Sequence, residues 1–217
     1  MRHLFISLLL LSTAASASLP EAADPRSDAP EQRAAPTTAY KSAPTYEQAL
    51  QAWRTPEDLN AWIGARFEYD MPRAMLLSET QRSKSGSLAI HRPGDFFAAP
   101  AGVCVDLARF AVETLWTIDP AVQARYLMIE FAPVTIAGNT LRMHWLASFK
   151  RDGKYYFFAD SKRPGHLSGP HASTQEFIDG YAKYRGRTIV AFRELESYER
   201  KKRTQATRQL KEAQQNQ

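Results

Sequence analysis

The chain has 217 residues and a mass of 24.5 kDa, and 44% of its residues are hydrophobic while 24% are charged. This composition excludes collagen-like and wholly disordered chains, and the length favours one folded domain. The single cysteine, Cys104, excludes intrachain disulfides and zinc sites that need several thiolates.

Residues 1–17 have the pattern of a secretory signal peptide. Arg2 supplies positive charge, residues 4–11 form an apolar run, and Ala15 and Ala17 form a small-x-small cleavage site. The run is much shorter than the ~20 residues of a membrane-spanning helix, although an uncleaved anchor is the alternative. No cysteine lies directly after the run, which excludes a lipoprotein. We therefore expect a periplasmic or secreted protein that is cleaved near Ala17.

The formal net charge of +5 is concentrated near the C-terminus. Residues 198–217 carry six basic side chains against two acidic ones, whereas residues 18–197 carry 21 of each sign. A nucleic-acid-binding protein places its positive charge on a folded face with aromatic residues among it, so we expect no nucleic-acid partner. The basic Gln-rich tail is expected to be a solvated, frayed helix, and the alternative is a tether to an anionic membrane surface.

The rest of the chain divides by composition into a linker and a domain. Residues 18–44 hold five prolines among small and charged residues, which predicts a disordered linker with little apolar surface to bury. Residues 45–197 are expected to form the folded domain. The elements predicted in chain order are helices at 46–53 and from 56, a short strand at 67–70, a helix at 72–80, a polar loop at 83–93, a helix at 104–116, strands at 125–134, 141–150 and 154–160, a helix at 173–184 and a strand at 188–192. Helices followed by an antiparallel meander predict an α+β fold.

Cys104 is expected in the first turn of its helix, because an apolar stripe at helical spacing begins at Val105 and the helix-breaking residues Pro100 and Gly102 come just before it. The unpaired N–H groups and the dipole at a helix start favour the thiolate, which predicts a nucleophile. The alternative is an inert buried thiol. Export favours the nucleophile, because an exported chain with one thiol either hides that thiol or uses it.

A cysteine nucleophile needs a base and a third residue that orients the base. Three histidines of the mature chain, His91, His166 and His171, fall in segments predicted as loops. His144 lies inside a predicted strand, which holds a side chain more firmly than a loop does. Its alternative role is that of a hydrogen-bonded histidine without catalytic function. Asp160 ends the next predicted strand and is the candidate for the orienting residue.

The register of the predicted hairpin decides whether His144 and Asp160 share a face of the sheet. A two-residue turn would pair Trp145 with Asp160 and place His144 on the other face. A three-residue loop over residues 151–153, with Gly153 left-handed in a G1 bulge, would pair His144 with Asp160. We expect the bulged register, because only this register, or an equivalent irregularity elsewhere, brings the two side chains together.

Asp106 and the aromatic residues at 155–158 are expected to have structural roles. Asp106 is expected to anchor a neighbouring loop, and the alternative is a part in the chemistry. The aromatic residues at 155–158 are expected in the core of the sheet, and the alternative is a ligand-binding platform.

Residues 102–108, Gly-Val-Cys-Val-Asp-Leu-Ala, resemble the G-x-C-x-D-x-A helix start of the transglutaminase-like superfamily. The resemblance continues through a His-Trp pair in a strand, His144-Trp145, to an aspartate that ends the next strand, Asp160, and it spans about residues 67–160. It implies a papain-like fold, in which N-terminal helices and the cysteine-bearing helix pack on an antiparallel sheet. It also implies a Cys-His-Asp triad at these positions and acyl transfer through a thioester. The chain is most similar to the bacterial transglutaminase-like cysteine proteinases, which act on proteins in the periplasm.

We expect no cofactor and no metal. Calcium is the alternative, because of the resemblance. Some members bind calcium through acidic residues around the cysteine, whereas here Val103 and Val105 flank Cys104 and only Asp106 is acidic. We expect an enzyme, an exported cysteine hydrolase or amidase whose partners are peptide or protein substrates in the cell envelope. The alternatives are a transamidase that cross-links proteins with the same triad, and a catalytically inactive envelope binding or scaffold protein.

Overall fold

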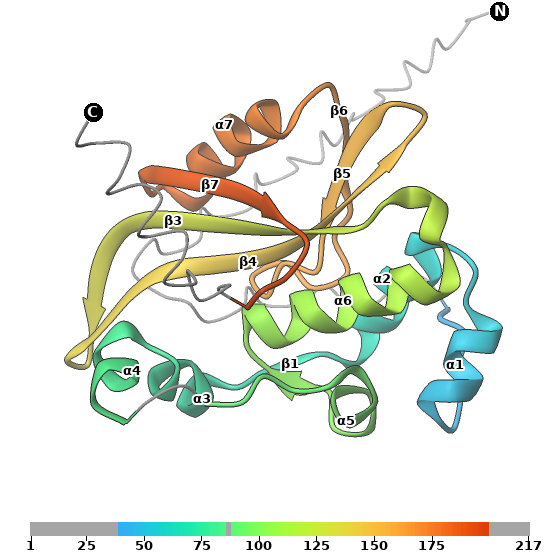
Figure 1. The fold of residues 1–217 in the computed structure, drawn as a ribbon, viewed down its shortest axis with the longest axis horizontal. Helices are drawn as coiled ribbons and strands as arrows, with labels where there is room; N and C mark the ends of the chain where they lie inside the picture. The colour runs from blue at the N-terminus through green and yellow to red at the C-terminus, as the bar shows by residue number, and fades with distance from the viewer. Residues whose placement is uncertain (1–38, 86–87, 200–217) are drawn as a thin grey trace, which may run out of the picture.

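The computed structural model describes residues 39–85 and 88–199, which form an α+β fold with helices on both faces of an antiparallel sheet (Figure 1). The helices are α1 (Tyr46–Ala52), α2 (Pro56–Arg66), α3 (Met71–Leu76), α4 (Glu79–Ser85), α5 (Pro93–Ala98), α6 (Cys104–Ile118) and α7 (Thr174–Arg185), and a 3-10 turn lies at Pro120–Val122. The strands are β1 (Glu68–Tyr69), β2 (Ala101–Gly102), β3 (Arg125–Ile136), β4 (Asn139–Arg151), β5 (Lys154–Phe158), β6 (Ser168–His171) and β7 (Ile189–Leu195). The predicted signal peptide, most of the predicted linker and the tail beyond residue 199 lie outside the described residues. Of the described helices, none has both the length and the apolar character needed to cross a bilayer.

The first two helices begin at their predicted caps. The hydroxyl groups of Thr45 and Thr55 each accept a hydrogen bond from the backbone N–H three residues later. Trp53, which follows α1, is fully buried, and its indole Nε1 donates to the carbonyl of Lys41 at 3.1 Å. Tyr40 also packs against the buried apolar cluster. The end of the predicted linker therefore contacts the folded domain.

The structure differs from the prediction between residues 71 and 98. The helix expected over residues 72–80 is instead two short helices, α3 and α4, and α5 begins at Pro93, at the end of the predicted polar loop. Ser78 separates α3 from α4, because its hydroxyl accepts the backbone N–H of Gln81 at 3.3 Å. A local side-chain cap thus divides a segment whose apolar spacing indicates one helix.

Within the described residues the main sheet has five strands in the order β6-β5-β4-β3-β7, and all its pairs are antiparallel. Strands β3, β4 and β5 form the predicted meander, and β7 returns alongside β3. The prediction missed β6, because the Gly, Ser and Pro residues of this segment are typical of a loop. A separate parallel pair, β1 with β2, leads into α6.

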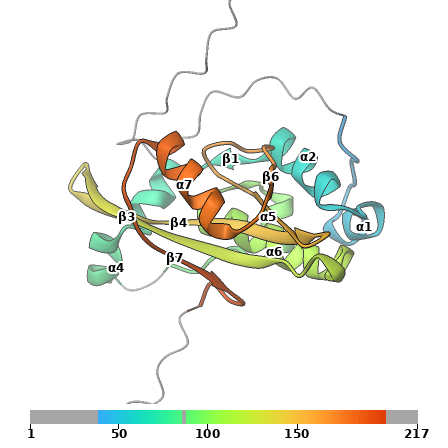
Figure 2. The same cartoon turned by 90° about the horizontal axis from the view of Figure 1, so that it is seen from above.

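Apolar side chains cover both faces of the main sheet. On one face, Leu107 and Leu115 of α6 join residues of α1, α2 and α5 in the larger cluster. On the other face, Phe177 of α7 joins residues of β3, β4 and β5. Figures 1 and 2 show α6 and α7 on opposite sides of the sheet. Phe157 and Phe158 of β5 are buried in different clusters, so these aromatic residues belong to the core, as predicted.

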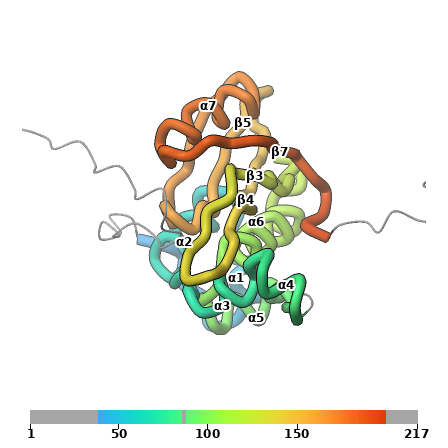
Figure 3. Tube along the Cα trace, turned by 90° about the vertical axis from the view of Figure 1, so that its left-hand side faces the viewer, coloured from blue at the N-terminus to red at the C-terminus, as the bar shows by residue number. Residues whose placement is uncertain are grey.

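The β3–β4 hairpin is held by the short helices near its tip (Figure 3). Gln81 Nε2 of α4 donates to Asn139 Oδ1 at 2.9 Å, and the N–H of Thr140 donates to Thr80 Oγ1 at 3.0 Å. The preceding helix α3 carries Arg73, which forms an ion pair with α6. The start of β4 and the first turn of α6 are therefore attached to the same pair of short helices.

The β4–β5 hairpin does not have the predicted three-residue loop. Arg151 pairs directly with Lys154, which leaves a two-residue turn. Asp152 and Gly153 have φ angles of 51° and 70°, and positive φ at both central residues is the pattern of a type I′ turn. The predicted bulge is wrong, because an Asp-Gly turn of this type already matches the right-handed twist of the two strands.

Gly165 joins the segment after β5 to α2. Its φ of +82° is left-handed, and an added Cβ would lie 2.6 Å from the Cα of Gly64. We expect Gly165→Ala to lower the free energy of unfolding by about 2 kcal/mol or more, because the two backbones would have to separate. Gly180→Ala is the control, since this helical position faces open space. The free energy of unfolding of this variant should rise by about 0.5–1 kcal/mol. Urea unfolding measures both changes, and wild-type stability of Gly165→Ala would contradict this account of the contact.

Candidate active site

Cys104 is the first residue of α6, as the sequence predicts, and it is half-buried. The residue before it, Val103, has no side-chain group that can cap a helix. The cap comes instead from Asp106, whose Oδ2 accepts the N–H of Val103 at 3.1 Å. The thiol thus lies at the N-terminus of a 15-residue helix, where the helix dipole favours a thiolate.

Asp106 is fully buried and anchors a loop, as predicted. Arg73 donates to both carboxylate oxygens at 2.7 and 2.8 Å, and the N–H of His91 donates to Oδ1 at 2.9 Å. An added Cβ at Gly102 would lie 3.1 Å from Asp106 Oδ2, so the glycine leaves room for this carboxylate. The Gly-x-Cys-x-Asp spacing therefore has a structural cause. The sequence did not identify Arg73, because it lies 33 residues from Asp106 and belongs to no motif with it.

The structure brings His144 and Asp160 together. His144 Nε2 lies 3.1 Å from Asp160 Oδ1, and the two residues are 5% and 4% exposed. They meet although the hairpin register is regular, because β5 ends at Phe158 and the next residue, Ala159, has a φ of 58°. This left-handed residue interrupts the alternation of side chains just before Asp160. The irregularity that the pair needs therefore lies after the strand and not in the turn.

The surroundings of Asp160 keep its carboxylate ionised. Oδ1 also accepts the N–H of Lys162 at 3.0 Å, and Oδ2 accepts the hydroxyl of Tyr181 at 2.8 Å. Burial alone would raise the pKa of Asp160, but the hydrogen bond and charge of His144 and the charge of Arg185 together hold that pKa below its ordinary value. Asp160 therefore faces His144 as a carboxylate.

Two residues of α7 complete this buried cluster, and the sequence did not identify them. Tyr181 Oη lies 3.0 Å from His144 Nε2, and Arg185 Nη1 donates to Tyr181 Oη at 2.9 Å. The rings of Tyr181 and His144 stack with an interplanar angle of 12°. Burial first, and then the charge of Asp160, raise the pKa of Tyr181 well above its ordinary value. The available signal was an i,i+4 Tyr-Arg pair on a predicted helix, a spacing at which the side chains of any helix are neighbours.

Two other histidines have different partners. His171, expected in a loop, is the last residue of β6, and its Nε2 lies 2.9 Å from Ser168 Oγ. His166 Nδ1 lies 3.2 Å from a guanidinium nitrogen of Arg163. The ring of His144, in contrast, is hydrogen-bonded to the buried carboxylate of Asp160.

The His144–Asp160 pair lies where β5 has separated from β4. The two strands pair only as far as Ala147, so His144 lies beyond the end of β5. The chain after Asp160 turns toward α2, where Asn60 Nδ2 donates to the carbonyl of Gly165 at 2.8 Å. The cysteine-bearing helix α6 packs against β4 as well (Figure 1). His144 thus lies in β4, Asp160 follows the strand that pairs with β4, and Cys104 begins the helix that packs against β4.

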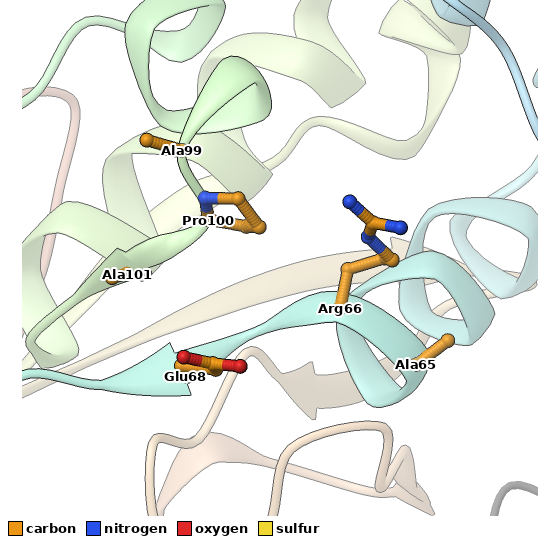
Figure 4. A pocket seen from close by; sticks show the side chains of 6 residues that line it. All are labelled: Ala65, Arg66, Glu68, Ala99, Pro100 and Ala101. Atoms are coloured by element: carbon orange, nitrogen blue, oxygen red, sulfur yellow. The ribbon is translucent and has the colours of Figure 1, made fainter.

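A hollow of about 510 Å³ adjoins the segment that leads into α6 (Figure 4). Its lining is Ala65, Arg66, Glu68, Ala99, Pro100 and Ala101. Glu68 of β1 pairs with Ala101 of β2, three residues before Cys104. Arg66 and Glu68 give this hollow one charged group of each sign near the start of α6.

Among the described residues, no group of three or more His, Cys, Asp or Glu side chains is arranged to hold a metal ion. A comparison of the chain with protein-family models found no match, and a search of curated proteins found none either. The likeness to the transglutaminase-like superfamily is therefore a resemblance carried by residues 102–108, 144–145 and 160.

Proposed function

We propose that this protein is a cysteine hydrolase or amidase that cleaves peptide or protein amide bonds through a thioester, with Cys104, His144 and Asp160 as its triad. The observation that carries the proposal is the buried hydrogen bond between His144 and Asp160. The position of Cys104 at the start of α6 and the order of the three residues along the chain support it. The proposal includes a papain-like form of the α+β fold and action on envelope proteins outside the cytoplasm.

In the first half of the proposed reaction, the Cys104 thiolate attacks the carbonyl carbon of the substrate amide. A sulfur–carbon bond forms, and the C–N bond then breaks as the His144 imidazolium gives its proton to the leaving amine. The backbone N–H of Cys104 supplies one donor to the developing oxyanion. Because Nε2 faces Asp160, the thiol has to approach Nδ1 of His144.

In the second half, a water molecule attacks the thioester carbon and gives a proton to the neutral imidazole of His144. Collapse of the intermediate breaks the sulfur–carbon bond and releases a carboxylic acid. This step restores the Cys104 thiolate and the His144 imidazolium, so protons balance over the cycle. A primary amine in place of water would give transamidation by the same residues.

Alkylation by iodoacetamide at pH 6 tests the proposal, and the single cysteine makes the label specific. We expect rapid alkylation with a parallel loss of amide hydrolysis, whereas a thiol with the ordinary pKa of ~8.5 is less than about 1% ionised at this pH. His144→Gln should slow the reaction at pH 6 by about 10-fold or more, because the imidazolium that stabilises the thiolate is lost. His171→Gln, which changes a histidine bonded to Ser168, is the control and should react like the wild type.

The other outcomes distinguish the alternative functions. Slow alkylation of the wild type at pH 6 would overturn the catalytic proposal and leave a binding or scaffold protein. Incorporation of a fluorescent primary amine into a glutamine-containing acceptor protein, faster than hydrolysis, would identify a transamidase.

A further inference from the structure

We propose that Tyr181 and Arg185 are positioning residues that keep the hydrogen of neutral His144 on Nε2 and so leave Nδ1 as the basic nitrogen. The catalytic consequence rests on the proposed function, but the placement of the hydrogen follows from the buried cluster itself. His144, Asp160, Tyr181 and Arg185 are each at most 5% exposed, so solvent hardly shares their mutual hydrogen bonds.

One assignment of donors and acceptors satisfies the hydrogen bonds of this cluster together. Arg185 has only N–H donors, so its bond to Tyr181 occupies a lone pair of Oη. Tyr181 has one hydrogen, which it donates to Asp160 Oδ2 at 2.8 Å. His144 Nε2 then faces a second lone pair of Tyr181 Oη at 3.0 Å and Asp160 Oδ1 at 3.1 Å. Nε2 must carry the hydrogen, because both neighbouring oxygens accept.

The other tautomer would break this pattern. An unprotonated Nε2 would face the ionised oxygen of Asp160, and the Tyr181 hydrogen would have to turn from Asp160 to His144. Both changes remove charge-assisted hydrogen bonds from a buried carboxylate, which makes them unfavourable. The raised pKa of Tyr181, caused first by burial and then by Asp160, agrees with a phenol that keeps its hydrogen.

Arg185 acts on His144 through Tyr181. The guanidinium carbon lies 5.1 Å from the ring centroid of Phe131 and 5.6 Å from that of Tyr181, so the side chain is held between β3 and α7. The N–H of Arg185 occupies one lone pair of Oη, so the Tyr181 hydrogen has to point to one of the other neighbours, and the Asp160 carboxylate is the stronger acceptor. Without Arg185 the hydroxyl loses this constraint and is free to rotate away from Asp160.

Nitrogen-15 NMR of the histidine side chains in the full-length chain tests the assignment directly. The Cys104→Ser background is used, because no thiolate then holds the imidazole in its charged form. We expect the shift of a protonated nitrogen at Nε2 and that of an unprotonated nitrogen at Nδ1, with His144→Gln identifying the signals. A hydrogen on Nδ1 would overturn the proposal even if the enzyme proved active. A protein without amidase activity but with Nε2 protonated would refute the proposed function and leave this inference standing.

Tyr181→Phe removes the hydroxyl and keeps the ring. We expect a mixture of His144 tautomers, and a fall in kcat for amide hydrolysis of about 10-fold or more with little change in KM, within the ~10,000-fold that a wrong tautomer costs a serine triad. Equal tautomer populations in Tyr181→Phe and the parent protein would overturn the role of Tyr181. Tyr184→Phe is the matched control on α7, because the buried hydroxyl of Tyr184 has no hydrogen-bond partner within the described residues. It should change neither the tautomer populations of His144 nor kcat.

Two substitutions of Arg185 separate its role as a hydrogen-bond donor from the bulk of its side chain. Arg185→Lys keeps a donor and a charge, whereas Arg185→Met removes both. We expect the lysine variant to retain more of the Nε2 tautomer of His144 than the methionine variant does. The same tautomer ratio in both variants would show that the guanidinium does not act through Tyr181.

Discussion

Cys104→Ser is expected to reduce amide hydrolysis by about 1,000-fold or more while the chain still folds. Serine is close to cysteine in size, and the half-buried position tolerates a hydroxyl. The serine hydroxyl is far less acidic than the thiol, so His144 and Asp160 do not activate the hydroxyl to the degree that they activate the thiol. In triad enzymes, loss of the nucleophile removes nearly all acceleration except that from substrate binding and the oxyanion hole.

The control for this variant is Thr117→Ser, which makes a conservative change at an exposed position in the last turn of the same helix. We expect full activity from the control and melting temperatures within a few degrees of the wild type for both variants. Turnover of a mixture of envelope proteins, measured beside circular dichroism, separates chemistry from folding. Wild-type turnover by Cys104→Ser would reject nucleophilic catalysis.

Elements with local determinants could be predicted from the sequence. The caps at Thr45 and Thr55 bond to N–H groups three residues away, and the apolar stripe of α6 repeats at helical spacing. Both signals lie within one or two turns of chain. The predicted start of α6 at Cys104 is confirmed for this reason.

The contact between His144 and Asp160 could be proposed from the sequence, but its cause could not. It depends on the left-handed φ of Ala159, and alanine has no preference for that conformation. From the sequence alone the irregularity is expected in the turn, because Gly153 is the residue type that usually adopts positive φ. Strained backbone is often found beside functional side chains, and Ala159 is fully buried next to this pair.

The contribution of α7 to the candidate site depends on contacts between residues that are far apart in the sequence, and a local sequence pattern does not indicate such contacts. Tyr181 lies 37 residues from His144 in the sequence, and the two meet because α7 crosses the face of the sheet opposite to α6. The sequence predicted the helix but not the face on which it packs. A candidate triad could therefore be named from the sequence, whereas Tyr181 and Arg185, the residues proposed to position the hydrogen of His144, could be identified only from the tertiary structure.

Asp106→Ala is expected to lower the free energy of unfolding by about 3–5 kcal/mol, the range for removing one partner of a buried ion pair. The carboxylate is fully buried and accepts two bonds from Arg73 and one each from the N–H groups of His91 and Val103. The variant leaves the guanidinium of Arg73, whose side chain is only 10% exposed, without this carboxylate. It also removes the cap from the helix that begins with Cys104.

Comparison of variants separates the charge from the packing at this position. Arg73→Met combined with Asp106→Leu should be less destabilising than Asp106→Ala alone, because no buried charge is then left without its partner. Asp179→Ala, an exposed position on α7, should change stability by less than about 0.5 kcal/mol. Urea unfolding gives all three values. If Asp106→Ala unfolded like the wild type, the Gly-x-Cys-x-Asp spacing would have no structural cause in this anchor, and the start of α6 would be held by packing against β4 alone.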